Sequence, residues 1–175
     1  MLRKILTIIG FYVLFQSSVL ATQAPSRTHQ GAEHAFLTRN QKKPGVHALP
    51  SGLQYRVIQK GDDKGAHPGP TDFVTVHYRG TLIDGTEFDS SYKRHAPASF
   101  AVNAVIPGWT EALQLMVPGA KWTIYVPAKL AYGTQAVGSL IKPNATLIFD
   151  IELLKVKHET DETPTDINDD VADGG

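Results

Sequence analysis

The sequence predicts an α+β fold in which an antiparallel β-sheet packs against one short helix. Two observations favour this fold. Several segments between residues 50 and 156 alternate apolar and polar residues, and only one segment in that range has helical spacing. Alternation with a period of two is typical of a strand that buries one face. Such strands are typical of an antiparallel sheet, so the helix is expected to cover the buried side.

Four segments carry the alternation, and each is expected to turn its apolar residues toward the core. Asp84 and Gly85 follow the second of these segments, and this pair of residues is typical of a tight hairpin turn. The residues expected on the buried face are Leu53, Tyr55 and Val57; Val74, Val76 and Tyr78; Trp122, Ile124 and Val126; and Leu147, Phe149, Ile151 and Leu153.

The one helix of this region is expected over residues 108–116. Apolar residues recur there at intervals of three and four, which places them on one helical face. They are Trp109, Ala112, Leu113 and Met116. A single short helix across a curved sheet leaves a cavity at its N-terminal end, and Trp109 would form the floor of that cavity. By spacing alone, Trp109 is equally well explained as an ordinary core residue.

The N-terminal residues are typical of a secretory signal, with two basic residues, an apolar run over residues 5–15 and small residues after it. We expect cleavage after Ala21, with Ala24 as the second choice, so that residues 1–21 are the signal peptide. The alternative is an uncleaved membrane anchor, but the run is shorter than the roughly 20 residues that span a bilayer. The expected location is the periplasm, with secretion or surface attachment as alternatives.

Two further segments flank the strand-rich region. Residues 22–49 are expected to form a linker or a docking arm, with a short helix around residues 31–42 that carries Phe36 and Leu37. Residues 157–175 hold seven acidic side chains, one basic side chain and almost no apolar ones. Such a composition cannot bury enough surface to become ordered, so we expect a disordered acidic tail.

Composition and charge exclude several classes of function. The chain has no cysteine, which excludes disulfides, thiol nucleophiles and cysteine-based zinc sites. Residues 22–156 hold 14 basic and 10 acidic side chains, a net charge of +4, without an arginine-rich stretch, so no nucleic-acid partner is expected. The seven histidines lack metal-ligand spacing, and no nucleophile elbow or phosphate-binding loop is present. Any enzymatic activity would therefore need no nucleophile, no metal and no cofactor.

Four stretches give the sequence a resemblance to a known family: VHYRGTLIDGTEFDSS, VIPGWTEALQLM, LAYG and NATLIFDIELL. In this order and spacing they resemble the FKBP-type peptidyl-prolyl cis/trans isomerases over about residues 50–156, the expected isomerase domain. Within that family the chain is most similar to the exported bacterial branch of the macrophage infectivity potentiator proteins. The long helical dimerisation region of that branch is not expected here, because only about 28 residues separate Ala21 from Pro50. A monomer is therefore expected.

The resemblance implies a five- or six-stranded antiparallel half-barrel wrapped around the helix, with a proline-binding pocket between sheet and helix. It implies catalytic roles for Asp89, Tyr132, Ile106 and Phe149. The substrate-binding residues that it implies are Tyr78, Phe88, Phe100, Val105, Trp109, Leu140 and Ile141. Trp109 would carry the pyrrolidine ring of the substrate. Ala98 stands where well-studied eukaryotic members have a phenylalanine, so we expect a more open pocket wall and weaker binding of macrolides of the rapamycin type.

The activity that the resemblance implies is isomerisation of X-Pro bonds in unfolded or exported proteins. The Ile106 N–H would bind the carbonyl after the proline, the Tyr132 hydroxyl would bind the carbonyl before it, and Asp89 would accept a hydrogen bond from Tyr78. Two alternatives stay open. One is a proline-binding chaperone or interaction module with little turnover, and the other is a secreted protein whose acidic tail engages a basic partner.

Overall fold

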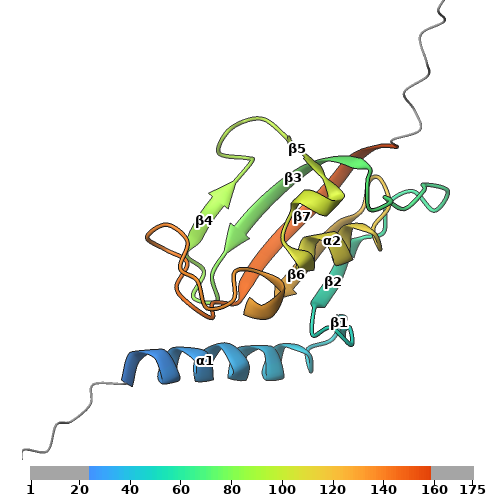
Figure 1. Ribbon diagram of the computed structural model, residues 1–175. Helices are drawn as coiled ribbons and strands as arrows, with labels where there is room; N and C mark the ends of the chain where they lie inside the picture. Colours follow the sequence, from blue (N-terminus) through green and yellow to red (C-terminus); the bar gives the residue numbers. More distant parts are fainter. Residues whose placement is uncertain (1–23, 159–175) are drawn as a thin grey trace, which may run out of the picture.

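The structure, a computed structural model, describes residues 24–158. The predicted signal peptide and nearly all of the predicted acidic tail lie outside the described residues. A curved antiparallel sheet forms the body of the molecule, with the short helix α2 (Pro107–Leu113) on one face and the longer helix α1 (Ala24–Asn40) along one end (Figure 1). Neither of these helices is long and apolar enough to cross a membrane.

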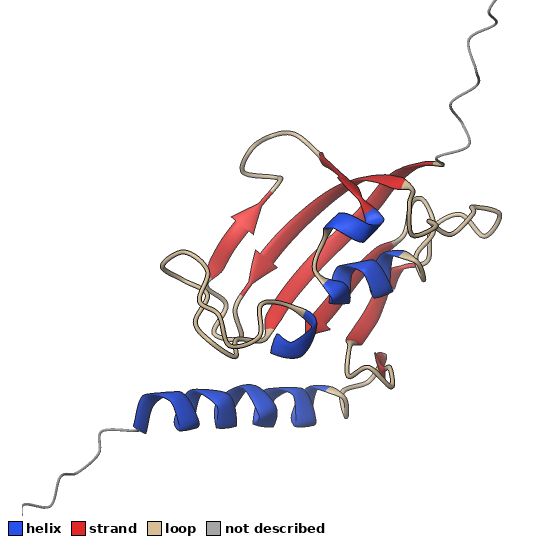
Figure 2. Ribbon diagram, in the orientation of Figure 1, coloured by secondary structure: helices blue, strands red, loops and turns tan. Residues whose placement is uncertain are grey.

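Seven strands form the sheet in the spatial order β1-β2-β6-β7-β3-β4, and β5 pairs with the first half of β3 beside β4 (Figure 2). The predicted antiparallel sheet is confirmed, and the very short β1 and β5 raise the strand number above the five or six expected. The strands are β1 Val46–Ala48, β2 Gln54–Gln59, β3 Phe73–Thr81, β4 Glu87–Ser90, β5 Ala98–Ala101, β6 Lys121–Val126 and β7 Leu147–Lys157.

The central strands β3, β6 and β7 bury the residues that the alternation predicts. The predicted inner residues of these three strands are at most 7% exposed, and they form one core with the apolar face of α2. The helix ends at Leu113, earlier than expected, and the chain continues as a turn in which Met116 remains fully buried. Pro118 prevents a helix from continuing through Val117, because the residue before a proline disfavours helical geometry.

Strand β2 departs from the predicted alternation. Leu53, directly before it, is fully buried, but Val57 is 36% exposed, whereas Gln54 on the opposite face is only 4% exposed. The reason is that the C-terminal part of α1 lies against Gln54, whereas Arg56 and Ile58 further along the same face of β2 stay exposed. Gln54 Nε2 donates to the Leu37 carbonyl at 3.0 Å, and Asn40 Nδ2 donates to Gln54 Oε1 at 3.0 Å.

Helix α1 begins seven residues before the helix expected at residues 31–42 and packs on the sheet (Figure 1). The Glu33 side chain is buried, and its Oε2 accepts the Thr146 N–H at 2.9 Å. The Phe36 ring lies 6.1 Å from the Tyr125 ring on β6, between centroids. The segment therefore contains the expected helix in a longer form, and this helix lies against one end of the sheet.

A tight turn joins β3 to β4 at the predicted position. The Leu82 N–H donates to the Thr86 carbonyl at 2.9 Å, and Asp84 Oδ1 accepts the Thr86 N–H at 2.9 Å. Gly85 has a φ of 87°, a left-handed conformation that glycine adopts without steric cost. This turn confirms the hairpin prediction and brings Phe88 of β4 beside β3.

Strand β7 continues past residue 156, where the domain was expected to end. It includes Lys157, and the next residue, His158, places its Nδ1 2.7 Å from Asp72 Oδ2. The Asp72 side chain is buried and also accepts the Gly69 N–H at 2.7 Å. The end of β7 is thus attached to the loop before β3.

Candidate functional site

A cavity of about 750 Å³ opens between the sheet and the N-terminal end of α2. The structure brings all eleven sequence-predicted site residues to this one cavity, although they span residues 78–149. They come from β3, β4, β5, α2, β7 and the loops that precede α2 and β7. Sequence reasoning missed four further lining residues, all in these loops: Ala104, Val137, Gly138 and Ser139.

Aromatic rings form the deep part of the cavity around Trp109, which is only 4% exposed. The rings of Tyr78, Phe100 and Phe149 meet the indole edge to face, with centroid distances of 5.2, 5.8 and 5.2 Å. Phe88 meets Phe149 in the same way at 5.5 Å. Edge-to-face pairs add specific geometry to apolar burial, so these rings hold one another in place.

The indole of Trp109 is therefore at once a core residue and a wall of the cavity, and the two interpretations of its spacing are compatible. Its Nε1 is buried and has no hydrogen-bond partner among the described residues. A buried indole N–H usually finds an acceptor. Since this one has none in the described chain, ring packing holds the side chain in place.

Two glycines allow the elements around the cavity to approach so closely. A Cβ on Gly108 would lie 2.5 Å from Val126 Cγ1, so only glycine lets the first turn of α2 rest on β6. A Cβ on Gly80 would lie 2.6 Å from the ring of Phe88. These contacts set the positions of Trp109, next to Gly108, and of the Phe88 ring.

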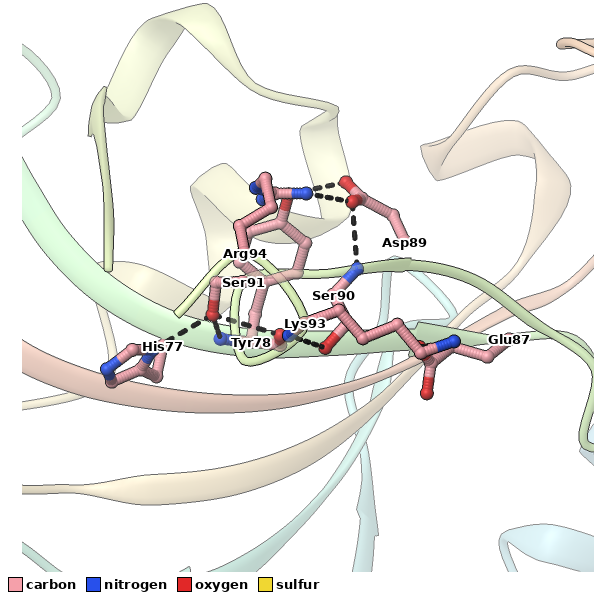
Figure 3. A network of polar contacts seen from close by, with 8 residues as sticks. All are labelled: His77, Tyr78, Glu87, Asp89, Ser90, Ser91, Lys93 and Arg94. Atoms are coloured by element: carbon pink, nitrogen blue, oxygen red, sulfur yellow. Dashed lines mark hydrogen bonds and ion pairs between the residues drawn. The ribbon is translucent and has the colours of Figure 1, made fainter. Parts of the chain in front are cut away.

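A polar network forms one rim of the cavity (Figure 3). The Tyr78 hydroxyl donates to Asp89 Oδ2, Arg94 donates to Asp89 Oδ1, and Arg94 Nη2 also donates to the Tyr78 hydroxyl at 2.8 Å. The expected hydrogen bond between Tyr78 and Asp89 is thus present. Sequence reasoning missed Arg94, which lies in the turn after β4 beside another cation, Lys93, and no spacing distinguishes the two.

This network determines the charge of its members. Burial and the hydrogen bond to Asp89 raise the pKa of Tyr78 above its ordinary value, so the phenol stays protonated and remains a donor. Burial alone would raise the pKa of Asp89, but hydrogen bonds from Tyr78 and Arg94 outweigh it and lower the pKa. The rim therefore carries a charged carboxylate between a neutral phenol and a guanidinium.

A buried serine supports the rim from behind. Ser91 is fully buried, and its Oγ accepts the Tyr78 N–H at 2.8 Å and lies 3.0 Å from His77 Nδ1 (Figure 3). The His77 ring stacks on Tyr92 at 4.7 Å between centroids. The backbone that carries Tyr78 is therefore held by the same turn that carries Arg94.

The opposite rim offers hydrogen-bond donors that have no partner. The Tyr132 hydroxyl and the Ile106 N–H form no hydrogen bond with any residue that the structure describes, and Tyr132 is 41% exposed. The loop after Tyr132 is ordered by its own backbone, because Val137 and Ile141 exchange two hydrogen bonds of 2.9 and 3.2 Å. Leu140, at the tip of this loop, is 41% exposed.

Ala98, expected at the edge of the cavity, lies on β5 opposite Val76 and packs partly against the core. It is not among the residues that line the cavity.

The arrangement favours binding over bond cleavage. Among the lining residues only Asp89 carries a charge, and Arg94 and Tyr78 already occupy its oxygens. A flat apolar group fits against aromatic rings, while two free donors at the rim can each bind a carbonyl oxygen. The site suits a ligand that combines an apolar ring with flanking peptide carbonyls.

Two families match the sequence. Residues 64–154 match the family described as FKBP-type peptidyl-prolyl cis-trans isomerase. Residues 9–57 match the family described as the domain amino terminal to FKBP-type peptidyl-prolyl isomerase. The first match covers more than half of the chain and includes all eleven expected site residues.

Similar proteins come from several bacteria. The outer membrane protein MIP of Legionella longbeachae is 53% identical over 148 residues, which are 82% of this chain and 63% of that protein. The peptidyl-prolyl cis-trans isomerase Mip of Coxiella burnetii is 56% identical over 123 residues, 70% of this chain and 53% of that protein. The chain thus spans less than two thirds of the length of these curated relatives.

Solved structures share the fold. A peptidyl-prolyl cis-trans isomerase of Pseudomonas syringae pv. tomato superimposes with a TM-score of 0.71 at 39% identity, over 78% of this chain and 99% of that one. The superposition takes in nearly all of that protein.

Proposed function

The chain belongs to the FKBP-type peptidyl-prolyl cis-trans isomerase family, and from that membership we propose that it catalyses the cis/trans isomerisation of X-Pro peptide bonds. The observation that carries this proposal is the aromatic cavity around Trp109, with unpaired donors on its rim. The cavity accepts a flat apolar ring, and proline is the residue whose preceding peptide bond exchanges between cis and trans.

The barrier to be lowered comes from amide resonance, which sets it at about 18–20 kcal/mol. The planar amide is more polar than the twisted one, because resonance separates charge between oxygen and nitrogen. A dry aromatic cavity withholds the water that stabilises the planar form, so it favours the twisted transition state. The proline ring would rest on Trp109, with Phe149, Phe100 and Phe88 as walls.

The donors on the rim would hold the peptide in a bent conformation. The Ile106 N–H would bind the carbonyl after the proline, and the Tyr132 hydroxyl would bind the carbonyl before it. Asp89 and Tyr78 would shape the facing rim, which Arg94 holds in place. Each tenfold gain in rate needs only about 1.4 kcal/mol, so several such contacts suffice.

We place the substrates among unfolded or exported proteins that contain X-Pro bonds, and we expect macrolides of the rapamycin type to compete for the same cavity. The signal-like N-terminus supports export to the periplasm, with secretion or surface attachment as alternatives. A relative named as an outer membrane protein is in keeping with this location.

The decisive experiment measures cis/trans exchange of a Leu-Pro peptide by NMR in the presence of the purified chain that starts at Thr22. We expect exchange to accelerate in proportion to enzyme concentration, and an excess of a macrolide to suppress the acceleration. Saturable binding of the peptide without acceleration would overturn the proposal and favour a proline-binding chaperone or interaction module.

A further inference from the structure

A second, shallower groove of about 430 Å³ adjoins the cavity. It lies along the exposed side of α2 and is lined by Asn103, Val105, Pro107, Thr110, Glu111 and Gln114. Val105 lines both the groove and the aromatic cavity, so a peptide can pass from one to the other over this residue.

Glu111 is the only charged residue of the groove. Its Oε1 accepts a hydrogen bond from Ser51 Oγ at 2.9 Å, and it forms no ion pair with any residue that the structure describes. The carboxylate on the rim of the cavity differs, because Asp89 pairs with Arg94. Glu111 is also half-buried, and it lines the groove without a basic partner among the groove residues.

The neutral groups of the groove add acceptors. Gln114 Nε2 donates to the Thr110 carbonyl at 3.0 Å, which leaves Gln114 Oε1 to accept from a ligand. The Thr110 hydroxyl donates to the Val102 carbonyl at 2.7 Å, so its hydrogen is not offered to the groove. A carboxylate and an amide oxygen together favour a cationic donor over an anion.

We propose that this groove is a subsite for the peptide segment that follows the proline, and that Glu111 selects lysine or arginine in that segment. The inference rests on the proposed function, in which the Ile106 N–H binds the carbonyl after the proline. Val105 directly precedes Ile106, so the chain that leaves this carbonyl is next to the entrance of the groove. The enzyme would therefore prefer substrates with a basic residue two or three positions after the proline.

The size of the preference follows from the exposure of the groove. Ion pairs that remain open to water contribute little, so we expect about a two- to five-fold difference in kcat/KM between a lysine and a neutral side chain. Salt should reduce this difference, because it screens exposed charges.

The test uses peptides that share a Leu-Pro bond and differ only at the second or the third residue after the proline, which is lysine, norleucine or glutamate. NMR exchange avoids a coupling protease, whose own specificity would respond to lysine. For the parent chain we expect kcat/KM to fall in the order lysine, norleucine, glutamate. Glu111→Gln should bring the lysine-to-norleucine ratio close to one.

Two variants control for unrelated effects. Glu152→Gln makes the same chemical change on the sheet, away from both cavities, and should keep the parent ratio. Ser51→Ala keeps the carboxylate of Glu111 but removes its hydrogen bond. This variant should therefore retain the preference for lysine.

Two outcomes would overturn the inference. An equal rate for lysine and norleucine in the parent means that the groove does not select charge, while turnover itself still supports the proposed function. A lysine preference that survives Glu111→Gln assigns the selection to another residue. Absence of turnover with every peptide would instead refute the proposed function.

Discussion

The residue Trp109 shows how one side chain can serve the core and the cavity together. It is almost completely buried, yet its ring lines the cavity between Tyr78, Phe100 and Phe149. Its indole N–H forms no hydrogen bond among the described residues, so the position does not require a polar atom. A smaller apolar side chain can therefore preserve the core and alter the floor of the cavity.

Substitution Trp109→Leu should lower turnover more than stability. Leucine still covers the sheet, so we expect the free energy of unfolding to fall by less than the roughly 3–5 kcal/mol typical of truncation to alanine. Loss of the flat surface should lower kcat/KM by at least about tenfold, or about 1.4 kcal/mol. Prolyl-peptide exchange and thermal unfolding measure the two effects. A folded variant that melts far below the parent and retains its turnover would identify Trp109 as a core residue only.

Substitution Tyr132→Phe should affect only substrate binding. The hydroxyl has no partner in the described chain and the residue is 41% exposed, so the melting temperature should not change. Loss of one hydrogen bond to a carbonyl should weaken peptide binding by about 0.5–1.5 kcal/mol. The preference for an apolar residue before the proline should remain. A variant with unchanged kcat/KM would remove Tyr132 from the proposed mechanism.

Turnover should vary little between about pH 6 and 8, because no step needs a proton transfer and neither Asp89 nor Tyr78 titrates there. The lowered pKa of Asp89 means that its charged form stabilises the fold above the ordinary aspartate pKa. This stabilisation should disappear only as the pH falls below about 4. A bell-shaped kcat/KM profile near neutral pH would instead implicate His77, which contacts Ser91 behind the rim.

Among the elements, α1 makes the contact that links the most distant parts of the chain. Glu33 accepts the N–H of Thr146, 113 residues away, at the end of the loop that carries Leu140 and Ile141. A buried carboxylate that satisfies a backbone N–H holds the helix in one position on the sheet. The helix therefore supports the loop that forms one wall of the cavity.

Substitution Glu33→Ala should destabilise the protein by about 1–3 kcal/mol, because it leaves the buried Thr146 N–H without an acceptor. The matched control is His34→Ala, on the exposed side of the same helix, which should stay within about 0.5 kcal/mol of the parent. Chemical denaturation measures both variants, and amide exchange at Thr146 should accelerate only in Glu33→Ala. Equal stability of the two variants would show that the contact does not hold α1.

The whole molecule is expected to be a monomer at micromolar concentration. The buried side of α1 faces its own sheet through Glu33, Phe36 and Asn40, and its exposed side is polar. The exposed positions include Gln30, His34, Thr38 and Arg39. Among residues 29–40, Ala32 alone adds an apolar side chain to this exposed side, which leaves little apolar area for a second copy. Light scattering of the chain from Thr22 should give the monomer mass, and a stable dimer would contradict this prediction.

The sequence by itself determined the central strands, the hairpin at Asp84–Gly85 and eleven of the residues that line the cavity. Strand alternation is a local pattern, because successive side chains of a strand such as β3 or β7 point to opposite faces of the sheet. The family resemblance supplied the distant members of the site, from Tyr78 to Phe149. Spacing alone left the role of Trp109 open.

Only the tertiary structure decided the contacts that join segments far apart in the chain. Gln54 appears polar and outward in the sequence, yet it is buried because α1 returns over that face. Arg94 joins the rim because the turn after β4 brings it to Asp89, and Glu111 faces a groove beside Val105. Each of these placements depends on which elements meet in space, and a periodicity of neighbouring residues contains no information about that meeting.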